Sequence, residues 1–318
     1  MRILALLLLA LSAQTAWAGG DALSWLERIH AATQKLSYTG TFVYRSGDQA
    51  ETSRVVHIAG RRGTRERLET LDGQPREIVR NGDEVTCYLP DSMTIRVDRQ
   101  TDHGVFPALL PENLQDIGEY YKVSAGAIER IAGYNSQEIV LQPKDKLRYG
   151  HKLWADVNTG MLLKSETLNE KNEPIEQFTF TQISIGGKID RNQLRPRFLA
   201  KSRAWQIENS SAVATSLAAS GWTIKPKLPG FKKVAEMKRT RGGSNEIGHV
   251  VYSDGVAAVS VFVELMANKT SLPPPGLSRQ GAINIYSRQV ASRLVTVVGE
   301  APAESIKKLA ESVEYRQP

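Results

Sequence analysis

The stretch Ser24-Trp-Leu-Glu-Arg-Ile-His-Ala-Ala-Thr-Gln-Lys-Leu36, which runs into Tyr38-Thr-Gly-Thr-Phe-Val-Tyr44, decides the fold. Its first half repeats apolar residues at helical spacing, and Ser24 with Glu27 has the spacing of a capping box. Its second half changes to the period of two that is typical of a strand. The stretch therefore predicts an amphipathic helix that packs on an aromatic strand face. The helical stripe consists of Trp25, Ile29, Ala32 and Leu36.

The first eighteen residues have the pattern of a cleaved secretory signal peptide. Arg2 precedes an apolar run over 3–11, and Ala16-Trp17-Ala18 resembles a signal peptidase site. The run is too short to cross a bilayer as a helix, although a retained membrane anchor is the alternative. Cys87 is the single cysteine, so the exported fold has to form without an internal disulfide. We expect its thiol to be buried and inert.

Residues 19–205 read as a domain of sequential antiparallel strands with a few helices. Hairpin signals occur at Asp72-Gly73, at Asn81-Gly82 and at Asn158-Thr-Gly160, each between β-branched or alternating residues. The run 175–183 alternates cleanly, and a short helix is expected near Ile117. The fold class is therefore α+β, with a large curved sheet or open barrel covered by helices.

A second, small α+β domain is expected over 221–318. It contains a hairpin at Ser253-Asp254-Gly255, strand-like runs over 283–290 and 293–299, and a closing helix that follows Pro302. Small polar residues between the two regions suggest a linker at 206–220.

Net charge differs between the two regions. Residues 221–318 contain fourteen Lys or Arg against eight Asp or Glu, whereas residues 19–220 contain twenty-six of each. The positive excess of the small domain favours anionic partners such as acidic proteins or lipid phosphates. Because the chain is expected to be exported, nucleic acid is not the predicted partner.

No catalytic or metal-binding pattern stands out. The five histidines do not pair at metal-ligand spacing, and no nucleophile elbow or phosphate-binding glycine loop occurs. We therefore expect neither an enzyme nor a bound cofactor or metal, and a hydrolase with a concealed site is the least favoured interpretation.

Aromatic and aliphatic residues are expected to share the inner face of the large sheet. In one interpretation the helix fills this concavity and the residues are ordinary core, which composition alone favours. In the other, part of the concavity stays open and binds acyl chains. The candidate lipid-cavity residues are Tyr38, Phe42, Tyr44, Tyr88, Ile95, Trp154, Phe178 and Phe180.

Several motifs in order resemble the RseB/MucB family of periplasmic regulators of the envelope-stress sigma factor. They cover essentially the whole chain after the signal peptide. The motifs are Trp25-Leu-x-Arg28, Leu36-x-Tyr38-x-Gly40-Thr41-Phe42, Leu71-Asp-Gly-x-Pro-Arg-Glu-Ile78, Leu153-Trp-x-Asp156, Thr159-Gly160, Tyr252-Ser-Asp-Gly255 and Val297-Val-Gly-Glu300.

The resemblance implies a first domain shaped like the lipoprotein carriers LolA and LolB. It also implies that the protein binds the periplasmic part of a membrane anti-sigma factor, RseA or MucA, and protects it from stress proteases. Release would follow when lipid, lipoprotein or lipopolysaccharide binds. A LolA-type periplasmic carrier of lipoprotein or lipid is the alternative, and a homo-oligomer is possible in either case.

Both domains are expected to hold the anti-sigma segment together, at an angle that the linker sets. Arginines would contact its acidic or polar groups while aromatic residues act as apolar anchors. The candidate partner-binding residues are Arg239, Arg241, Tyr252, Phe262, Arg288 and Arg293. A solvated strand face is the equally weighted alternative for each arginine.

Overall fold

A computed structural model describes residues 20–60, 63–99, 116–241, 245–265 and 276–317. The predicted signal peptide over residues 1–18 lies outside these residues. The first region contains α1 (Gly20–Lys35), β1 (Tyr38–Ser46), β2 (Gln49–Ile58), β3 (Arg65–Thr70), β4 (Glu77–Asn81), β5 (Glu84–Leu89), β6 (Thr94–Arg99), α2 (Ile117–Tyr120), β7 (Tyr121–Ile131), β8 (Tyr134–Pro143), β9 (Gly150–Asp156), β10 (Leu162–Leu168) and β11 (Pro174–Ile185).

The rest of the chain continues the same alternation of strands and turns. It contains η1 (Arg191–Leu194), η2 (Ser202–Ala204), β12 (Gln206–Ala214), η3 (Leu217–Ser220), β13 (Trp222–Ile224), β14 (Lys232–Arg241), β15 (Asn245–Ser253), β16 (Ala258–Leu265), β17 (Gly276–Gln280), β18 (Ile283–Val290), β19 (Arg293–Gly299), α3 (Ala303–Glu311) and β20 (Val313–Tyr315). No described helix is long and apolar enough to cross a membrane.

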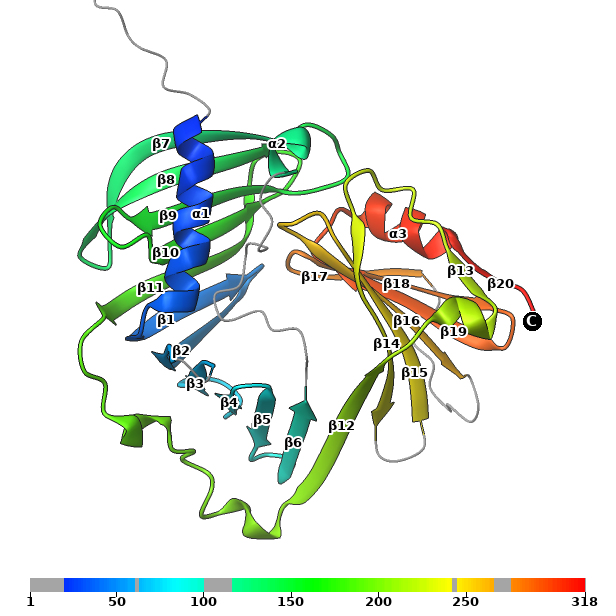
Figure 1. Ribbon diagram of the computed structural model, residues 1–318, viewed down its shortest axis with the longest axis horizontal. Helices are drawn as coiled ribbons and strands as arrows, with labels where there is room; N and C mark the ends of the chain where they lie inside the picture. The colour runs from blue at the N-terminus through cyan, green and yellow to red at the C-terminus, as the bar shows by residue number, and fades with distance from the viewer. Residues whose placement is uncertain (1–19, 61–62, 100–115, 242–244, 266–275, 318) are drawn as a thin grey trace, which may run out of the picture.

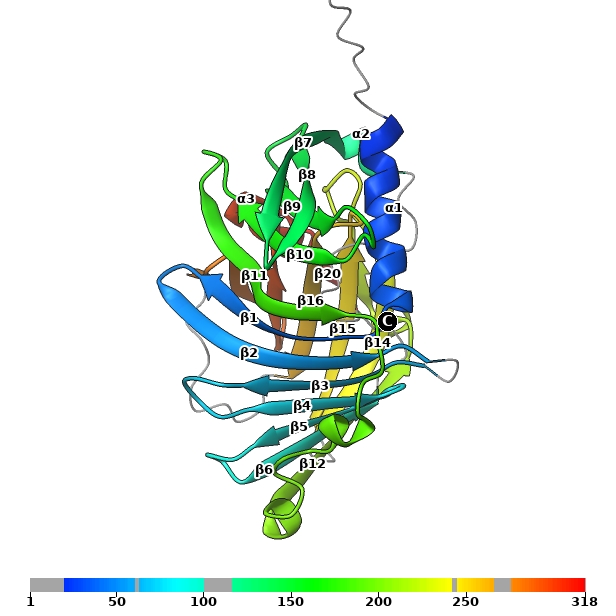
Figure 2. The ribbon, with the colours of Figure 1, turned by 90° about the vertical axis from the view of Figure 1, so that its left-hand side faces the viewer.

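Eighteen strands form one hydrogen-bonded sheet, which is strongly curved and not closed into a barrel (Figures 1 and 2). The spatial order is β7-β8-β9-β10-β11-β1-β2-β3-β4-β5-β6 in the first region, then β12-β14-β15-β16-β19-β18-β17. The expected α+β class, with a large open antiparallel sheet and a small second unit, is confirmed.

Helix α1 forms because one stripe of its surface is apolar and buried. Trp25, Leu26 and Ile29 pack on residues of β8, β9 and β10, and Figure 1 shows the helix lying across these strands. The prediction of a capping box at Ser24 and Glu27 was wrong, because α1 begins at Gly20 and Ser24 lies inside the helix. The aspartate at the β9–β10 turn, Asp156, accepts hydrogen bonds from the amide and hydroxyl of Thr159, which confirms that hairpin.

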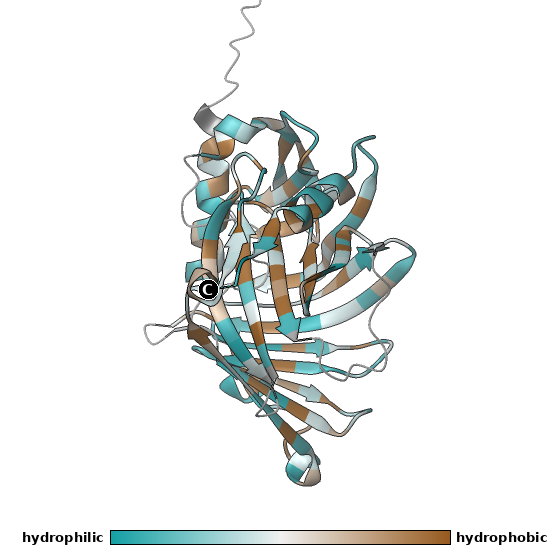
Figure 3. Ribbon diagram, turned by 90° about the vertical axis from the view of Figure 1, so that its right-hand side faces the viewer, coloured by the Kyte–Doolittle hydropathy of each residue, from teal (hydrophilic) through white to brown (hydrophobic). Residues whose placement is uncertain are grey.

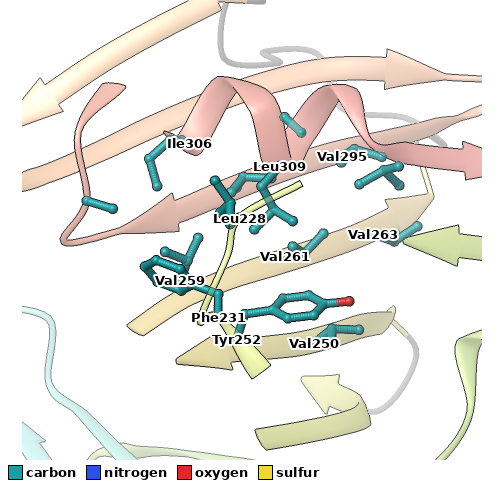
Figure 4. Close-up of a cluster of buried hydrophobic side chains, with 14 of the residues drawn as sticks. Leu228, Phe231, Val250, Tyr252, Val259, Val261, Val263, Val295, Ile306 and Leu309 are labelled. Carbon is teal, nitrogen blue, oxygen red and sulfur yellow. The ribbon is translucent and has the colours of Figure 1, made fainter. Parts of the chain in front are cut away.

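The second region has its own core, shown in Figure 4. Val261, Val295 and other strand residues meet Ile306 and Leu309 of α3, and all four side chains are fully buried. Figure 3 shows hydrophobic and hydrophilic residues alternating along these strands, as a sheet with one covered face requires. The predicted strands 283–290 and 293–299 and the closing helix are confirmed.

The segment 206–220, expected as a linker, contains a strand. Strand β12 pairs parallel with β6, from Gln206 opposite Thr94 to Ser211 opposite Arg99, and antiparallel with β14. Composition misled here because Ser, Asn and Ala disfavour strands by themselves, whereas two adjacent edges supply hydrogen bonds to both sides of β12.

Candidate binding surfaces

Four of the predicted cavity residues form a packed aromatic cluster on the inner face of the large sheet. Phe178 lies 4.9 Å from Phe42 and 5.1 Å from Phe180 between ring centroids. Tyr38 meets Phe180 edge to face at 6.1 Å. All four are buried, together with Met161, Leu163 and Val55. Among the described residues, therefore, they are core, and an acyl chain would have to displace them.

The inner face is continuous from helix α1 to the contact with the second region. Ser165 lies opposite both Phe178 and Leu153, so the aromatic cluster and the residues beneath α1 point to the same side. Tyr44, opposite Phe178 on β1, has 36% of its surface exposed. It marks the place where the packed inner face opens to solvent.

Trp154, Tyr88 and Ile95 do not share this face, which corrects the predicted set. Trp154 lies opposite Lys164 rather than Ser165, and the Lys164 ammonium sits 4.0 Å from its ring centroid. Tyr88 pairs with both Glu77 and Ile95 on the opposite, outer side of the sheet. Period two assigns faces within one strand, but the register between distant strands cannot be read from the sequence.

Arg148 is the centre of the contact between the two regions. It precedes β9, is 1% exposed, and donates 2.7 Å to Asp254 at the β15–β16 turn and 2.6 Å to the carbonyl of Pro229. The hydroxyl of Tyr121 donates to the same Asp254 carboxylate at 3.0 Å. The guanidinium also lies 5.3 Å from the ring centroid of Phe231. A charge buried this fully is retained only when it is paired and hydrogen-bonded.

Two carboxylates, Glu176 of the first region and Glu300 of the second, also lie at this contact. Ser46, Glu176, Thr167 and His151 form one cross-strand row on β1, β11, β10 and β9. Burial raises the pKa of Glu176 to about 7, and the charge of Glu300 from the second region adds to the rise. Burial also raises the pKa of Glu300 and lowers the pKa of His151 to about 4. The carboxylates of Glu176 and Glu300 therefore repel each other where the two regions meet when both are ionised.

Two of the predicted partner-binding residues lie together. Arg239 donates 3.1 Å to Nδ1 of His249, and the His249 ring stacks on Phe262 at 4.3 Å. The same arginine lies 3.4 Å from Asp98 of β6. Burial and the charge of Arg239 lower the pKa of His249 to about 4, so the imidazole is neutral near pH 7. This group lies on the face of the second region opposite its α3-covered core, since His249 pairs with Phe262.

The structure does not bring the other candidates to this group. Tyr252 is buried in the core of the second region, and Arg288 donates 3.2 Å to the carbonyl of Ala310 beside α3. Arg293 begins β19 at the turn from β18, and the side chain of Arg241 lies outside the described residues.

The described residues contain no group of three His, Cys, Asp or Glu that could hold a metal ion. Cys87 is half-buried, and burial raises the pKa of its thiol. Sequence reasoning missed Arg148 and Asp254, because Asp254 was fully explained by its turn and no pattern distinguishes a buried arginine in a polar loop.

These features define a two-region protein built on one open sheet, whose inner face is filled by packed aromatic and aliphatic side chains. Residues 21–198 match the model of the MucB/RseB N-terminal domain, and residues 216–314 match that of the MucB/RseB C-terminal domain. The chain belongs to the MucB/RseB family.

Relatives and solved structures agree with this assignment over nearly the whole length. The chain is 30% identical to the sigma factor AlgU regulatory protein MucB of Pseudomonas aeruginosa, covering 98% of both proteins. It is 26% identical to the sigma-E factor regulatory protein RseB of Haemophilus influenzae, covering 92% of this chain and 90% of the relative. A crystal structure of MucB in complex with MucA(peri) has a TM-score of 0.70 and 27% identity, covering 94% of this chain and 100% of the other.

Proposed function

We propose that this protein binds the periplasmic part of a membrane anti-sigma factor and so regulates an envelope-stress sigma factor. The observation that carries the proposal is the similarity, along 94% of the chain, to MucB crystallised with MucA(peri). The proposed role is that of a non-enzymatic periplasmic regulator, exported by the predicted signal peptide, that shields the anti-sigma segment from proteases.

The group around Arg239 and Phe262 is the proposed anchor for the partner. Phe262 is partly exposed, and its ring stacks on the ring of His249 with 4.3 Å between the centroids, so its position is fixed before binding. Rigid aromatic and arginine side chains lose little conformational entropy when a partner binds, which is why they dominate binding energies. Asp98 holds Arg239 toward β6, so a segment that contacts this arginine also reaches the first region.

The test is a titration of the purified protein with the periplasmic fragment of the anti-sigma factor from the same organism. We expect specific binding, and Phe262→Ala should weaken it by at least about tenfold, as for an anchor residue. Leu277→Ala, at a 54% exposed position on the edge strand β17, is the matched control. No measurable binding by the unaltered protein would refute the regulator, whereas equal loss in both variants would refute only the anchor.

Release on lipid binding is the second part of the proposal. A lipid releases the partner only if it binds the free arrangement more tightly than the engaged one, and each ligand must then weaken the other by the same factor. Titrating partner into protein with and without a saturating acyl lipid measures that factor directly. A factor of one removes lipid from the mechanism and leaves partner binding intact. The packed aromatic cluster supports no separate role as a carrier of lipid cargo.

A further inference from the structure

The segment between β11 and β12 concentrates positive charge. Residues 186–205, which we call the basic strap, contain six Lys or Arg and one Asp. The remainder of 19–220 then holds twenty basic against twenty-five acidic residues, so the balance of zero in the first region hides a local excess. The basic residues are Lys188, Arg191, Arg195, Arg197, Lys201 and Arg203.

Buried carboxylates fix the strap to the outer side of the large sheet. Glu77, which is 0% exposed, accepts hydrogen bonds from the backbone amides of Arg197 at 3.0 Å and Phe198 at 3.3 Å. The Arg197 guanidinium donates 2.7 Å to Glu69, which lies opposite Glu77 on β3. Figure 2 shows the strap running in front of the strands on this side of the molecule. The strap therefore presents its cations from a defined position rather than from a loose loop.

The remaining cations of the strap point into solvent. All five are exposed, and in the part of the chain that the structure describes none of them forms an ion pair. Apolar surface accompanies them: Leu199 is 56% exposed, and the rings of Phe198 and Trp205 lie 6.1 Å apart, both partly exposed. Exposed lysines and arginines beside leucine and aromatic side chains are typical of surfaces that lie at a membrane interface.

We propose that the basic strap binds the surface of an anionic phospholipid bilayer. Its cations are spread along turns and the short helices η1 and η2 rather than gathered around one ligand, which matches the diffuse charge of a lipid surface better than a single anion. Leu199, from the middle of the same segment, would enter the headgroup region. This inference is independent of the proposed partner, because the strap lies on the outer side of the sheet and the Arg239 group lies on the second region.

The test compares vesicle binding by the exported protein and two variants with equal loss of charge. Vesicles of phosphatidylcholine contain either no anionic lipid or about 30 mol% phosphatidylglycerol, at about 0.1 M salt. The strap variant replaces Arg191, Arg195, Lys201 and Arg203 by Gln. The control replaces Lys225, Lys227, Lys307 and Arg316, which are exposed residues of the second region, by Gln.

We expect the unaltered protein to bind only the anionic vesicles and to be released at about 0.5 M salt. Each cation near the surface contributes roughly fivefold, so the strap variant should lose at least about a hundredfold in affinity. The control should lose less than about fivefold. Equal losses in both variants, or equal binding to neutral vesicles, would overturn the proposal. The proposal would also be overturned if vesicle binding were too weak to detect while polyglutamate bound through the same strap residues.

A second measurement does not depend on removing charge. With Cys87 replaced by Ser, an environment-sensitive dye is placed by Leu199→Cys or, as control, by Leu277→Cys, which are similarly exposed at 56% and 54%. Anionic vesicles should shift the dye emission to the blue at position 199 and leave it unchanged at 277. A shift at 277 alone, or at neither position, would refute binding through the strap.

Discussion

The two regions carry positive charge in different ways. The second region has the larger net charge, yet half of its described cationic side chains form an ion pair with a carboxylate, as Lys233 does with Glu236 and Lys308 with Glu304. The first region is balanced overall, but five exposed cations of its strap form no ion pair with described residues. Net charge counted by domain therefore does not show where cations without a partner gather along the chain, because pairing and position decide which charges remain available to a ligand.

The first prediction asks whether the two regions are one folding unit. Replacing Arg148 by Met leaves Asp254 buried without its charged partner, and we expect a loss of about 3–5 kcal/mol in the free energy of unfolding. Urea unfolding followed by tryptophan fluorescence should also separate into two transitions. Arg130→Met, at an exposed position of β7, is the control and should leave one transition unchanged. A change of less than 1 kcal/mol in Arg148→Met would show that the contact does not couple the regions.

The second prediction targets the packed aromatic cluster of the first region. A Cβ at Gly40 would lie 2.7 Å from both the carbonyl oxygen of Gln182 and the ring of Phe180. Gly40→Ala should therefore destabilise the protein by about 1–3 kcal/mol, as overpacking does. Gly118→Ala, where no atom lies within 4 Å of the added carbon, is the control. Thermal unfolding of the two variants measures the difference, and equal melting temperatures would mean that the cluster is loosely packed.

The third prediction concerns pH at the contact between the regions. The pKa of Glu176 is raised in the folded state from 4.5 to about 7. Between these pH values the folded protein therefore keeps a proton on Glu176 that the unfolded chain has lost. Ionisation of Glu176 therefore lowers the free energy of unfolding. This loss of stability is absent below pH 4.5 and is complete above pH 7. Glu176→Gln should then raise the free energy of unfolding at pH 8 by about 1–2 kcal/mol, after allowance for partial solvation, and leave it unchanged at pH 4.

Glu170→Gln, which replaces an exposed carboxylate, is the control for this pH series. Denaturant unfolding curves at pH 4, 6 and 8 would measure the change in the free energy of unfolding. A parallel displacement of the Glu176→Gln curve at all three pH values would show that Glu176 does not titrate in this range.

The smallest effect distinguishes paired from unpaired cations directly. Lys308 lies 2.7 Å from Glu304 one helical turn earlier in α3, whereas Lys201 in the strap has no described ion pair. Lys308→Gln should cost about 0.3–0.5 kcal/mol, and Lys201→Gln should cost nothing measurable. Repeating both melts at about 1 M salt should abolish the difference. A larger cost for Lys201→Gln would mean that the strap cation stabilises the fold.

The sequence predicted most elements and some of their neighbours. Period two and the Asn-Gly turn placed β4 and β5 correctly, and apolar spacing placed α3 with Leu309 toward the core. The register across strands was beyond reach, so Tyr88 was assigned to the wrong face of the sheet. The parallel strand β12 and the buried Arg148 were missed because both depend on neighbours that are distant in the chain.

Strand β12 has a mechanical consequence for any switch in this protein. Six of its residues run beside β6 while the other edge of the strand pairs with β14. A hinge made of loose chain would rotate freely, but here a reorientation must shear or unzip a hydrogen-bonded ladder. Movement of the second region relative to the first therefore has to break these hydrogen bonds together and has an activation barrier. Partner release that depended on this movement would be slow and all-or-none.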